Sequence, residues 1–441
     1  MTRKKKIRVA IYSGEIPSTT FIERLIRGLA EKGHTIFLFG EITKKVSYGK
    51  NVVVSGYKGK INKLWQWIKW SVLLGLFQSK DKKKLDAILK ERFGHRLRHA
   101  QVKAYPFLWY KPDIVHIQWA KNLEDWMWVK EFGMKVVLSL RGAHINYSPL
   151  ADPMLAQMYE RNFPKVDGFH AVCKAIGVEA EKYGADPNTI RVVYSGLDLK
   201  DFPWAMDSGR KIQNSGFKIQ DSRLRIQDSE FRIQETGSQE SHPSQDPDPT
   251  FPSVEVQPPI LNSEFRILSI GRAHWKKGYH FALNACKILK DKGMKFQYTI
   301  IGGAGDEELL FQRHQLRLEN EVELLGRIPF DQVLMRMKEA DLFFLPSVEE
   351  GIANVVLESM ALGTPVLTTD CGGMTETVRD GENGWVVPIR DVQAMAEKIL
   401  WIANYPDEVQ QILIQKARET IEEQHTIQRM VKDFERLFEE I

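Results

Sequence analysis

Two glutamates in the second half of the chain, Glu350 and Glu358, are separated by seven residues, in a segment that starts as a loop and enters a predicted helix near Ala353. This spacing places one carboxylate at the mouth of the helix and the other about one turn inside, on the same side. Carboxylates accept hydrogen bonds from hydroxyls, so the pair suits a polyhydroxylated ligand such as a sugar nucleotide. The open N–H groups at the helix N-terminus suit a phosphate. The alternative is an acidic first turn that only complements the helix dipole.

Two cations, Arg272 and Lys277, lie in the sequence GRAHWKKG directly after a predicted strand. Loops at the carboxyl ends of parallel strands are where open α/β sheets bind ligands. Arginine can hold a diphosphate with a bidentate fork and lysine can act on it as a point charge, so the two side chains could neutralise a diphosphate leaving group. The alternative is a solvated basic turn.

A bound metal is not needed for that chemistry, because two cations can replace Mg²⁺ at a diphosphate. The one Asp-x-Asp sequence, Asp246 and Asp248, lies in a low-complexity segment. His95 and His99 have the four-residue spacing of helical metal ligands, but arginines flank them and the segment supplies no third ligand, which favours a solvated basic face. We therefore expect no metal and no other cofactor.

The elements that must position these residues alternate along the chain. Short β-branched runs are separated by longer amphipathic stretches, which is typical of mostly parallel, doubly wound sheets. The predicted strands are residues 7–12, 35–39, 52–54, 113–117, 136–140, 168–172 and 191–193 in the first half, and 265–270, 298–301, 323–325, 342–345, 366–368 and 385–387 in the second. The fold class is therefore α/β, with two Rossmann-like domains in tandem.

Residues 206–263 differ abruptly from the rest of the chain. Four units of seven residues, RKIQNSG, FKIQDSR, LRIQDSE and FRIQETG, are followed by a tail rich in Ser, Pro and Asp. Four units are too few to bury a repeat core, and the last three place their apolar residues two apart. We expect a low-complexity insert or linker that is disordered; the alternative is a segment that binds a partner.

Length and composition limit the class of protein. The chain has 441 residues, of which 43% are hydrophobic and 27% charged, which excludes collagenous, coiled-coil and wholly disordered chains. A net charge of +5 is no signature of nucleic-acid binding. Three widely separated cysteines without a CxxC pair or a secretory leader indicate a reducing cytoplasm. The most apolar segment, residues 64–77, is too short to span a membrane.

One segment is locally basic and aromatic. Residues 57–84 combine Trp65, Trp67 and Trp70 with lysines on both sides of a short apolar run. Interfacial helices use this composition to lie on an anionic bilayer. The alternative is that the tryptophans pack into the domain while the lysines form an ordinary surface. Membrane contact would place the protein at the inner face of the cytoplasmic membrane.

These motifs, taken in order, resemble the donor domain of family 4 glycosyltransferases of the GT-B fold. The resemblance is dense over residues 265–403, where Arg272 and Lys277, the two spaced glutamates, a Gly-Gly stretch with Glu376, and DGENGWVV follow one another. Residues 16–40 and 192–202 resemble the first loop and helix and the end of the acceptor domain. The resemblance implies two Rossmann-like domains facing a central cleft. Residues 1–205 would be the acceptor side, 264–425 the nucleotide-sugar donor domain, and 426–441 a helix that returns to the first domain.

The activity that the resemblance implies is a retaining transfer of a sugar from a nucleotide-diphosphate sugar. The acceptor would be a saccharide or a lipid-linked saccharide, in the synthesis of envelope or extracellular polysaccharide. Arg141 stands where the family often has histidine, so the role of that position is open. The implied catalytic residues are Arg272, Lys277 and Glu350; the donor-binding residues are Glu358, Ile352, Ala353, Asn354, Gly271 and Arg327; and the acceptor-side residues are Ser18, Thr19, Arg141 and His144.

Two alternatives of other classes are a sugar-nucleotide isomerase with the GT-B fold and a catalytically silent nucleotide-sugar binding protein. The spaced glutamates argue against the isomerase. The silent protein would be indicated by loss of Arg272, Lys277, Glu350 or Glu358, and all four are present. The donor sugar, its base, the acceptor and the linkage are not specified by any of these motifs.

Overall fold

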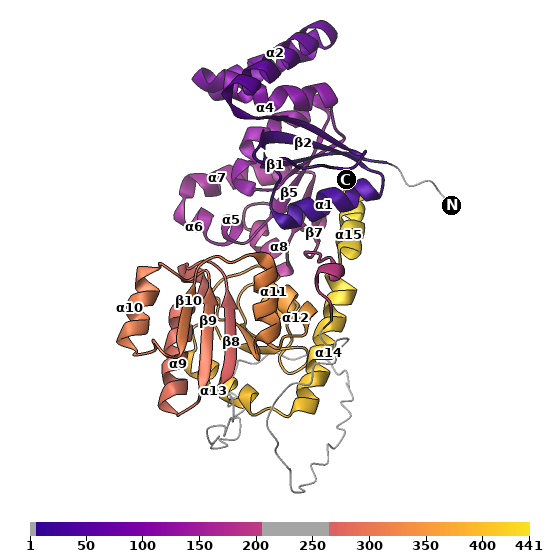
Figure 1. The fold of residues 1–441 in the computed structure, drawn as a ribbon. Coiled ribbons are helices and arrows are strands. Elements are labelled where there is room, and N and C mark those ends of the chain that lie inside the picture. The colour runs from indigo at the N-terminus through magenta and orange to yellow at the C-terminus, as the bar shows by residue number, and fades with distance from the viewer. Residues whose placement is uncertain (1–5, 205–263) are drawn as a thin grey trace, which may run out of the picture.

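The computed structural model describes residues 6–204 and 264–441, which form two α/β domains stacked along the long axis of the molecule (Figure 1). The repeats and the tail predicted for residues 206–263 lie outside the described residues. Each of the thirteen strands predicted from the sequence overlaps a strand of the structure. The α/β class and its two Rossmann-like sheets are confirmed.

The first sheet has the strand order β3-β2-β1-β4-β5-β6-β7, and every neighbouring pair is parallel. The order reverses between β1 and β4, which creates a crevice at the carboxyl ends of these two strands. Its strands are β1 (Arg8–Ile16), β2 (Thr35–Ile42), β3 (Val52–Tyr57), β4 (Ile114–Ile117), β5 (Lys135–Leu140), β6 (Gly168–Ala171) and β7 (Ile190–Val192).

The second sheet repeats this plan with the order β10-β9-β8-β11-β12-β13, again entirely parallel. The reversal here lies between β8 and β11, so the loops that carry Arg272 and Glu350 leave neighbouring strand ends. Its strands are β8 (Phe265–Ile270), β9 (Phe296–Ile301), β10 (Val322–Leu325), β11 (Leu342–Leu345), β12 (Val366–Thr369) and β13 (Trp385–Val387).

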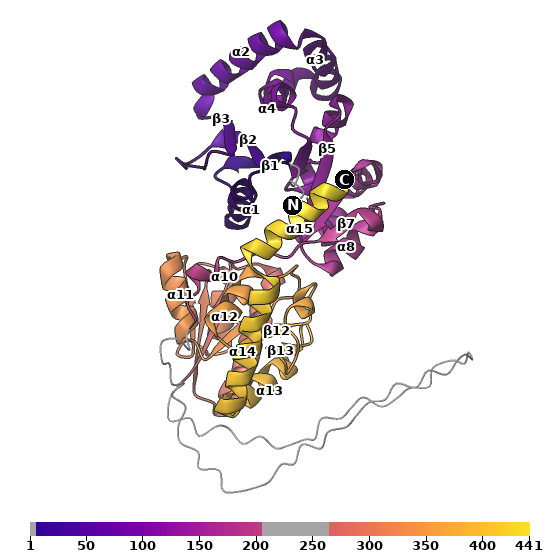
Figure 2. The same ribbon diagram turned by 90° about the vertical axis from the view of Figure 1, so that its right-hand side faces the viewer.

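Helices cover both faces of each sheet (Figures 1 and 2). The first domain contains α1 (Thr20–Glu31), α2 (Gly59–Phe77), α3 (Ser79–Phe93), α4 (Leu97–Tyr110), α5 (Ala143–Asn146), α6 (Ser148–Ala151), α7 (Pro153–Asn162) and α8 (Lys174–Glu181). The remaining helices are α9 (Tyr279–Asp291), α10 (Glu307–Gln315), α11 (Phe330–Glu339), α12 (Asn354–Leu362), α13 (Val392–Ala403), α14 (Asp407–Gln424) and α15 (Ile427–Glu440).

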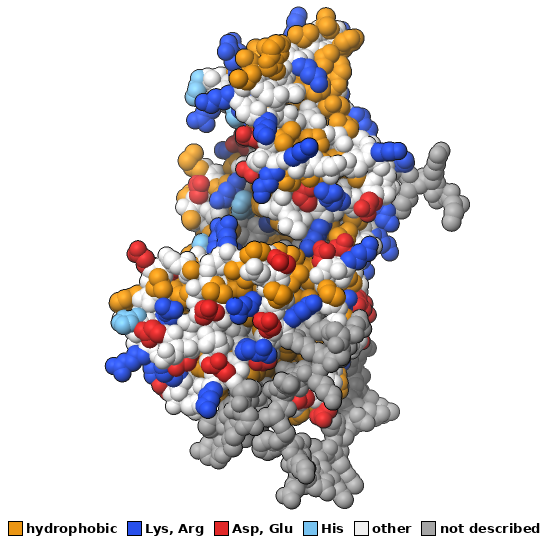
Figure 3. All heavy atoms as spheres, in the orientation of Figure 1, with side chains coloured by type: hydrophobic (Ala, Val, Ile, Leu, Met, Phe, Trp, Pro, Cys, Tyr) orange, Lys and Arg blue, Asp and Glu red, His pale blue; other side chains and the backbone are white. Residues whose placement is uncertain are grey.

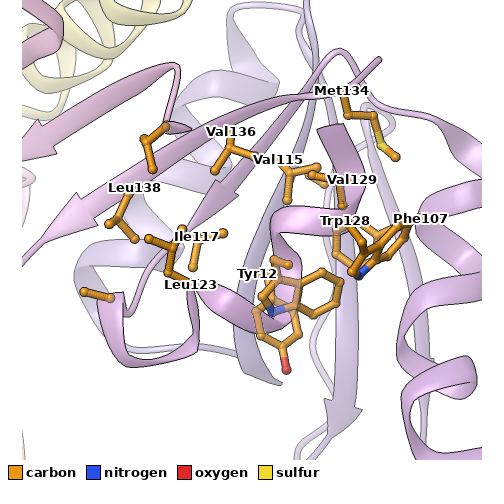
Figure 4. Packing of buried hydrophobic residues seen from close by; sticks show 14 of the residues in the cluster. Tyr12, Phe107, Val115, Ile117, Leu123, Trp128, Val129, Met134, Val136 and Leu138 are labelled. Atoms are coloured by element: carbon orange, nitrogen blue, oxygen red, sulfur yellow. The ribbon is translucent and has the colours of Figure 1, made fainter. Parts of the chain in front are cut away.

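The alternation of strand residues divides each domain into two cores. In β1, Val9 and Ile11 face the core beneath α1 and α15, whereas Ala10 and Tyr12 face the core beneath α4. The second of these cores is aromatic, with Tyr12, Phe107 and Trp128 packed beside the aliphatic residues of β4 and β5 (Figure 4). Burial on both faces explains why the strands read as continuous apolar runs.

The last helix, α15, lies against the first domain although α14, which precedes it, packs on α12 of the second (Figure 2). The crossing is tied by main-chain hydrogen bonds: the Leu197 N–H donates to the His425 carbonyl (2.7 Å) and the Ile427 N–H donates to the Leu197 carbonyl (3.2 Å). Beyond it, Phe434 packs on the ring of His170, with 4.6 Å between ring centres. The chain therefore completes the first domain with its final residues.

The tryptophans of α2 do not share one environment, which corrects part of the expected membrane contact. Trp70 is buried against the rings of Trp109 and Tyr110. Trp67 is half-buried and donates its indole N–H to Gln101 Oε1 (3.0 Å). Only Trp65 of the three is exposed, because its position on α2 faces away from the sheet.

We expect the contact between α1 and α15 to be sensitive to a single methyl group. A Cβ at Gly28 would lie 2.4 Å from Val431 Cγ2, so Gly28→Ala should lower the free energy of unfolding by about 1–3 kcal/mol through overpacking. Val431→Ala removes the obstructing methyl groups. The double variant should therefore lose less unfolding free energy than the two single variants lose together. Urea denaturation of the four proteins measures this coupling; strictly additive effects would contradict it.

Candidate functional site

Two loops of the second domain pack main chain against main chain at the crevice between β8 and β11. The Val348 N–H donates to the Lys276 carbonyl (2.7 Å). Gly278, at φ +66°, has no room for a side chain, since a Cβ there would lie 1.9 Å from the Pro346 carbonyl oxygen. This contact fixes the loop that carries the predicted cations beside the loop that carries Glu350.

An ion pair joins these two loops. Lys277 Nζ is 2.6 Å from Glu350 Oε1, and Lys276 Nζ is 3.8 Å from Glu350 Oε2. The side chains of Lys277 and Glu350 are only 13% and 11% exposed, so their interaction is weakly screened. Arg272, in contrast, is exposed. The structure thus brings Lys277 and Glu350 together and leaves Arg272 exposed to solvent.

Glycines also hold the main chain of Glu350 from the other side. A Cβ at Gly372, at φ +53°, would lie 1.8 Å from the Glu350 carbonyl oxygen. The next residue, Gly373, donates its N–H to the Gly351 carbonyl (3.0 Å), and a Cβ there would lie 2.5 Å from Cys173 of the first domain. The Gly-Gly stretch therefore lets the β12 loop pass between Glu350 and the first domain.

Glu376 joins the two domains at the start of α8. Its carboxylate accepts the N–H groups of Lys174 (2.8 Å) and Ala175 (3.1 Å) and the hydroxyl of Tyr194 (3.0 Å). A carboxylate at a helix N-terminus satisfies open N–H groups and complements the helix dipole. Glu376 thus acts here as a cap supplied by one domain to a helix of the other.

The first domain also reaches the β11 loop directly. Asn146, at the end of α5, donates its amide N–H to Glu349 Oε1, and the ring of Tyr147 contacts that of Trp275 with 5.6 Å between centres. Burial raises the pKa of the Glu349 carboxyl, and the Asn146 hydrogen bond acts in the opposite direction. Residues next to the Lys277–Glu350 pair are therefore in contact with the facing domain.

Glu358 lines a separate cavity of about 730 Å³ between the domains. Thr19 and Arg24 line it from the first domain, and Asn354 and Phe330 from the second. Burial raises the pKa of Glu358 to about 7, with Arg24 lowering it in part. The Asn354 Oδ1 atom is buried without a hydrogen-bond partner in the described part of the chain. The cavity thus presents two acceptors that a ligand with hydroxyl or N–H groups would satisfy.

The other predicted donor residues differ in position. The Ala353 N–H donates to Met374 Sδ (3.3 Å) and is therefore already paired within the second domain. Ile352 packs in the apolar contact between the two domains. The Gly271 carbonyl accepts a hydrogen bond from the Tyr279 hydroxyl (3.1 Å), beside Lys277. Arg327 is exposed on the loop after β10 and does not line the cavity of Glu358.

The predicted acceptor-side residues lie at two places. Ser18 and Thr19 line a second cavity of about 640 Å³ at the carboxyl ends of β1, β2 and β3, and Thr19 lines both cavities. Arg141 is held inside the first domain: it donates to Gln118 Oε1 (2.9 Å) and stacks on Phe21 at 4.0 Å. Burial lowers the pKa of Arg141 to about 9. These contacts favour a structural role for Arg141 over direct acceptor binding.

Near Arg141, the ring of His144 stacks beside that of Trp119 with 5.6 Å between centres, and its Nδ1 is buried without a described partner. Burial lowers the pKa of His144, and the neighbouring Lys121 and Arg141 lower it further.

Within residues 6–204 and 264–441, no three His, Cys, Asp or Glu side chains gather as a metal site. In the same residues, no helix is both long and apolar enough to cross a bilayer.

Comparison with known proteins identifies both halves of the chain. Residues 18–201 match the family described as Glycosyltransferase Family 4, and residues 253–420 match Glycosyl transferases group 1. The two matches together span most of the chain. The chain belongs to glycosyltransferase family 4.

Relatives in this family agree over part of their length. The amylovoran biosynthesis glycosyltransferase AmsK of Erwinia amylovora is 36% identical over 182 residues, which is 39% of this chain and 45% of AmsK. WcaL of Salmonella typhimurium, a candidate colanic acid biosynthesis glycosyltransferase, is 35% identical over 162 residues, 35% of this chain and 40% of WcaL. The matched region thus covers less than half of the length of each of these relatives.

Solved structures show the fold over the whole molecule. Anabaena HepE in complex with UDP and glucose superposes with a TM-score of 0.63 at 14% identity, covering 99% of this chain and 100% of HepE. Sucrose-phosphate synthase from Thermosynechococcus elongatus superposes with a TM-score of 0.67 at 15% identity, covering 98% of both chains. This glycosyltransferase family 4 member therefore has the GT-B fold that its motifs predicted.

Sequence reasoning missed Arg24, Asn146 and Gln118, which contact or line the site from the first domain. Each is a single polar residue in an ordinary helix or loop, and nothing in its spacing sets it apart. Only the three-dimensional contact between the domains reveals these residues.

We expect Gly278→Ala to displace the Lys277 loop. The new Cβ would overlap the Pro346 carbonyl, and the positive φ adds strain of about 1 kcal/mol, so the loss of stability should exceed about 2 kcal/mol. Gly293→Ala is the matched control, since Gly293 has φ +77° but nothing within 4 Å of a Cβ. Thermal unfolding compares the two variants; equal decreases in Tm would show that the close approach at Gly278 is unimportant.

Proposed function

We propose that this protein is a retaining glycosyltransferase that moves a sugar from a nucleotide-diphosphate sugar to a saccharide or lipid-linked saccharide in polysaccharide synthesis. The observation that carries the proposal is the Lys277–Glu350 pair at the strand-order reversal of the second sheet. Glu358 lies on α12, the helix that follows the Glu350 loop, and lines the cavity between the two domains. The isomerase and the silent binding protein are the competing functions.

The donor would lie along the second domain. The Glu358 carboxylate would accept the ribose hydroxyls, and Arg272 and Lys277 would hold the diphosphate, while Glu350 accepts hydroxyls of the sugar. The two cations offset the charge of the diphosphate, so the reaction as proposed uses no metal. Thr19, which lines both cavities, marks where the acceptor would meet the donor.

The transfer itself would take place on one face of the sugar. The bond from C1 to the diphosphate oxygen breaks with its electron pair going to the diphosphate, and the acceptor oxygen bonds to C1 from the same face. The acceptor hydroxyl proton passes to the departing diphosphate oxygen. Lys277 is 13% exposed, and a cation in such a water-poor place stabilises the charge that develops on the leaving group.

The comparisons support the substrate class by analogy. AmsK is named for amylovoran biosynthesis, and CapM of Staphylococcus aureus, 27% identical over 179 residues, for capsular polysaccharide biosynthesis. HepE has been solved with UDP and glucose and with UDP-glucose. The HepE complexes make UDP-glucose the first nucleotide sugar to test.

We expect donor affinity to depend on the ionisation of Glu358. Its pKa is raised to about 7, and only the ionised carboxylate accepts both ribose hydroxyls, so affinity should increase as the pH rises from 6 to 8. Glu358→Gln should weaken binding about tenfold or more at pH 8 and remove this pH dependence. Titration calorimetry with UDP-glucose, GDP-mannose and ADP-glucose measures both effects.

The control for this experiment is Glu408→Gln, an exposed carboxylate at the start of α14. Unchanged affinity in Glu358→Gln, or no binding of any of the three nucleotide sugars to the unmodified protein, would contradict the donor site. Release of the nucleoside diphosphate from the bound donor separates the enzyme from its alternatives. Neither an isomerase nor a silent binding protein releases it.

The enzyme is further proposed to work at an anionic membrane, which it would contact through α2. The apolar residues Ile61, Trp65, Ile68, Val72 and Leu76 recur at helical spacing along α2 and are between 37% and 77% exposed. Hydrophobic side chains, drawn in orange, gather at the α2 end of the molecule, with blue lysine and arginine side chains beside them (Figure 3). We call these five residues the α2 stripe.

The part of the sequence that contains the α2 stripe is strongly basic. Residues 58–103 contain thirteen lysines and arginines but three aspartates and glutamates, a formal charge of about +10, whereas the whole chain carries +5. Each lysine or arginine near an anionic bilayer contributes about 1 kcal/mol to binding. The apolar stripe and the surrounding cations thus suit the interface of an anionic membrane.

We expect the protein to float with vesicles of phosphatidylglycerol and not with those of phosphatidylcholine. Replacing four residues of the α2 stripe by glutamine should reduce the bound fraction several-fold, because apolar area no longer enters the bilayer. The variant carries Ile61→Gln, Trp65→Gln, Ile68→Gln and Val72→Gln, and the control carries Phe311→Gln, Met335→Gln, Trp401→Gln and Ile412→Gln, which are exposed in the second domain. Equal flotation of variant and control would contradict the contact through α2.

A further inference from the structure

The cavity of the first domain carries its own cluster of basic side chains, which the donor site does not use. It has a volume of about 640 Å³ and lies at the carboxyl ends of β1, β2 and β3, beside α2 and α4. Lys63 from α2 and His99 and Lys103 from α4 line it. Lys63 lies on the same side of α2 as the buried Trp70, seven residues on, and so faces the domain and not the α2 stripe.

These basic side chains are close together, and neither of the two lysines has an ion-pair partner in the described part of the chain. Lys63 Nζ donates to His99 Nδ1 at 2.9 Å and lies 5.0 Å from the centre of the Tyr57 ring. Among residues 6–204 and 264–441, no carboxylate forms an ion pair with Lys63 or Lys103. Burial lowers the pKa of His99, and Lys103, Lys63 and Arg96 lower it further. Such crowding of positive charge is relieved when an anion binds.

A polar row leads from this cluster toward the donor cavity. The strand register places Glu15, Glu41 and Tyr57 opposite one another at the ends of β1, β2 and β3. Neighbouring strands lie about 4.8 Å apart, so the row extends about 10 Å across the sheet. All three residues line the cavity, together with Thr19, which also lines the donor cavity.

We propose that Lys63, His99 and Lys103 bind a phosphate group of the acceptor, whose saccharide extends along Glu15 and Glu41 to Thr19. This inference rests on the proposed function and adds to it the chemical class of the acceptor. Two ammonium groups, with an imidazole beside them, offset the two negative charges of a phosphate monoester and also the single charge of a phosphodiester that joins a lipid to a saccharide. The carboxylates of the row accept sugar hydroxyls.

The phosphate could belong to a lipid-linked saccharide or to a soluble sugar phosphate, and both would make the same contacts. The position of Lys63 on α2, whose opposite side carries the α2 stripe, favours the lipid-linked form. A lipid chain attached to the phosphate could then remain in the bilayer while the saccharide occupies the cavity.

The test measures the binding of octyl phosphate, inorganic phosphate and glucose 1-phosphate to the full chain by titration calorimetry. Lys63→Ala combined with Lys103→Ala should weaken binding at least tenfold. The control combines Lys292→Ala and Lys295→Ala, which removes the same charge from exposed positions of the second domain and should leave binding unchanged. A Lys277→Ala variant should also leave it unchanged, because a phosphate at the donor site would depend on Lys277.

Tighter binding of octyl phosphate than of glucose 1-phosphate would support the site with a lipid-linked acceptor, and the reverse order would support it with a soluble sugar phosphate. The proposal is overturned if none of the probes binds, if the Lys63/Lys103 variant equals its control, or if Lys277→Ala abolishes binding. Nucleotide-sugar binding is measured on the same samples. A protein that binds a nucleotide sugar but no phosphate probe keeps the proposed function and loses only this acceptor site.

Discussion

The position of Glu350 depends on main-chain contacts where no side chain fits. On one side Gly278 meets the Pro346 carbonyl, and on the other Gly372 meets the carbonyl of Glu350 itself. Because these contacts join backbone to backbone, they fix the loops without relying on long, flexible side chains. The Lys277–Glu350 pair is therefore placed by the sheet and by three strand-end loops, which is the kind of rigid support that a binding or catalytic site needs.

The same loops also connect the two domains. Glu376 caps α8, Asn146 donates to Glu349, and the chain returns through Thr426 to complete the first domain with α15. Residues adjacent to the ion pair thus belong to the interdomain contact as well as to the site. A change in the angle between the domains would act directly on the β11 loop and on the cavity that holds Glu358.

Much of the fold could be predicted, because each strand is buried on both faces and appears as a short β-branched run. The spaced glutamates and the two cations of the site were also visible, since their chemistry depends on local spacing. Partners distant in sequence were not. The thioether of Met374, twenty-one residues away, takes the N–H of Ala353, and Arg24 reaches the cavity of Glu358 from the other domain.

The tryptophans of α2 illustrate a second limit. Their composition indicates an interfacial helix, but composition alone does not say which face of the helix meets the sheet. The structure places Trp67 and Trp70 on the inner face with Leu74, while Trp65 lies on the outer face with Ile61 and Ile68. The apolar surface therefore consists mainly of aliphatic residues that drew no attention in the sequence.

The uneven distribution of charge makes this molecule an electric dipole. About ten positive charges gather between residues 58 and 103 at one end, so the rest of the chain carries a formal excess of negative charge. A negatively charged surface would rotate such a molecule before any contact forms, over a distance set by the Debye length of about 8 Å at physiological ionic strength. The α2 end would then arrive first, together with the first-domain cavity that Lys63 of α2 lines.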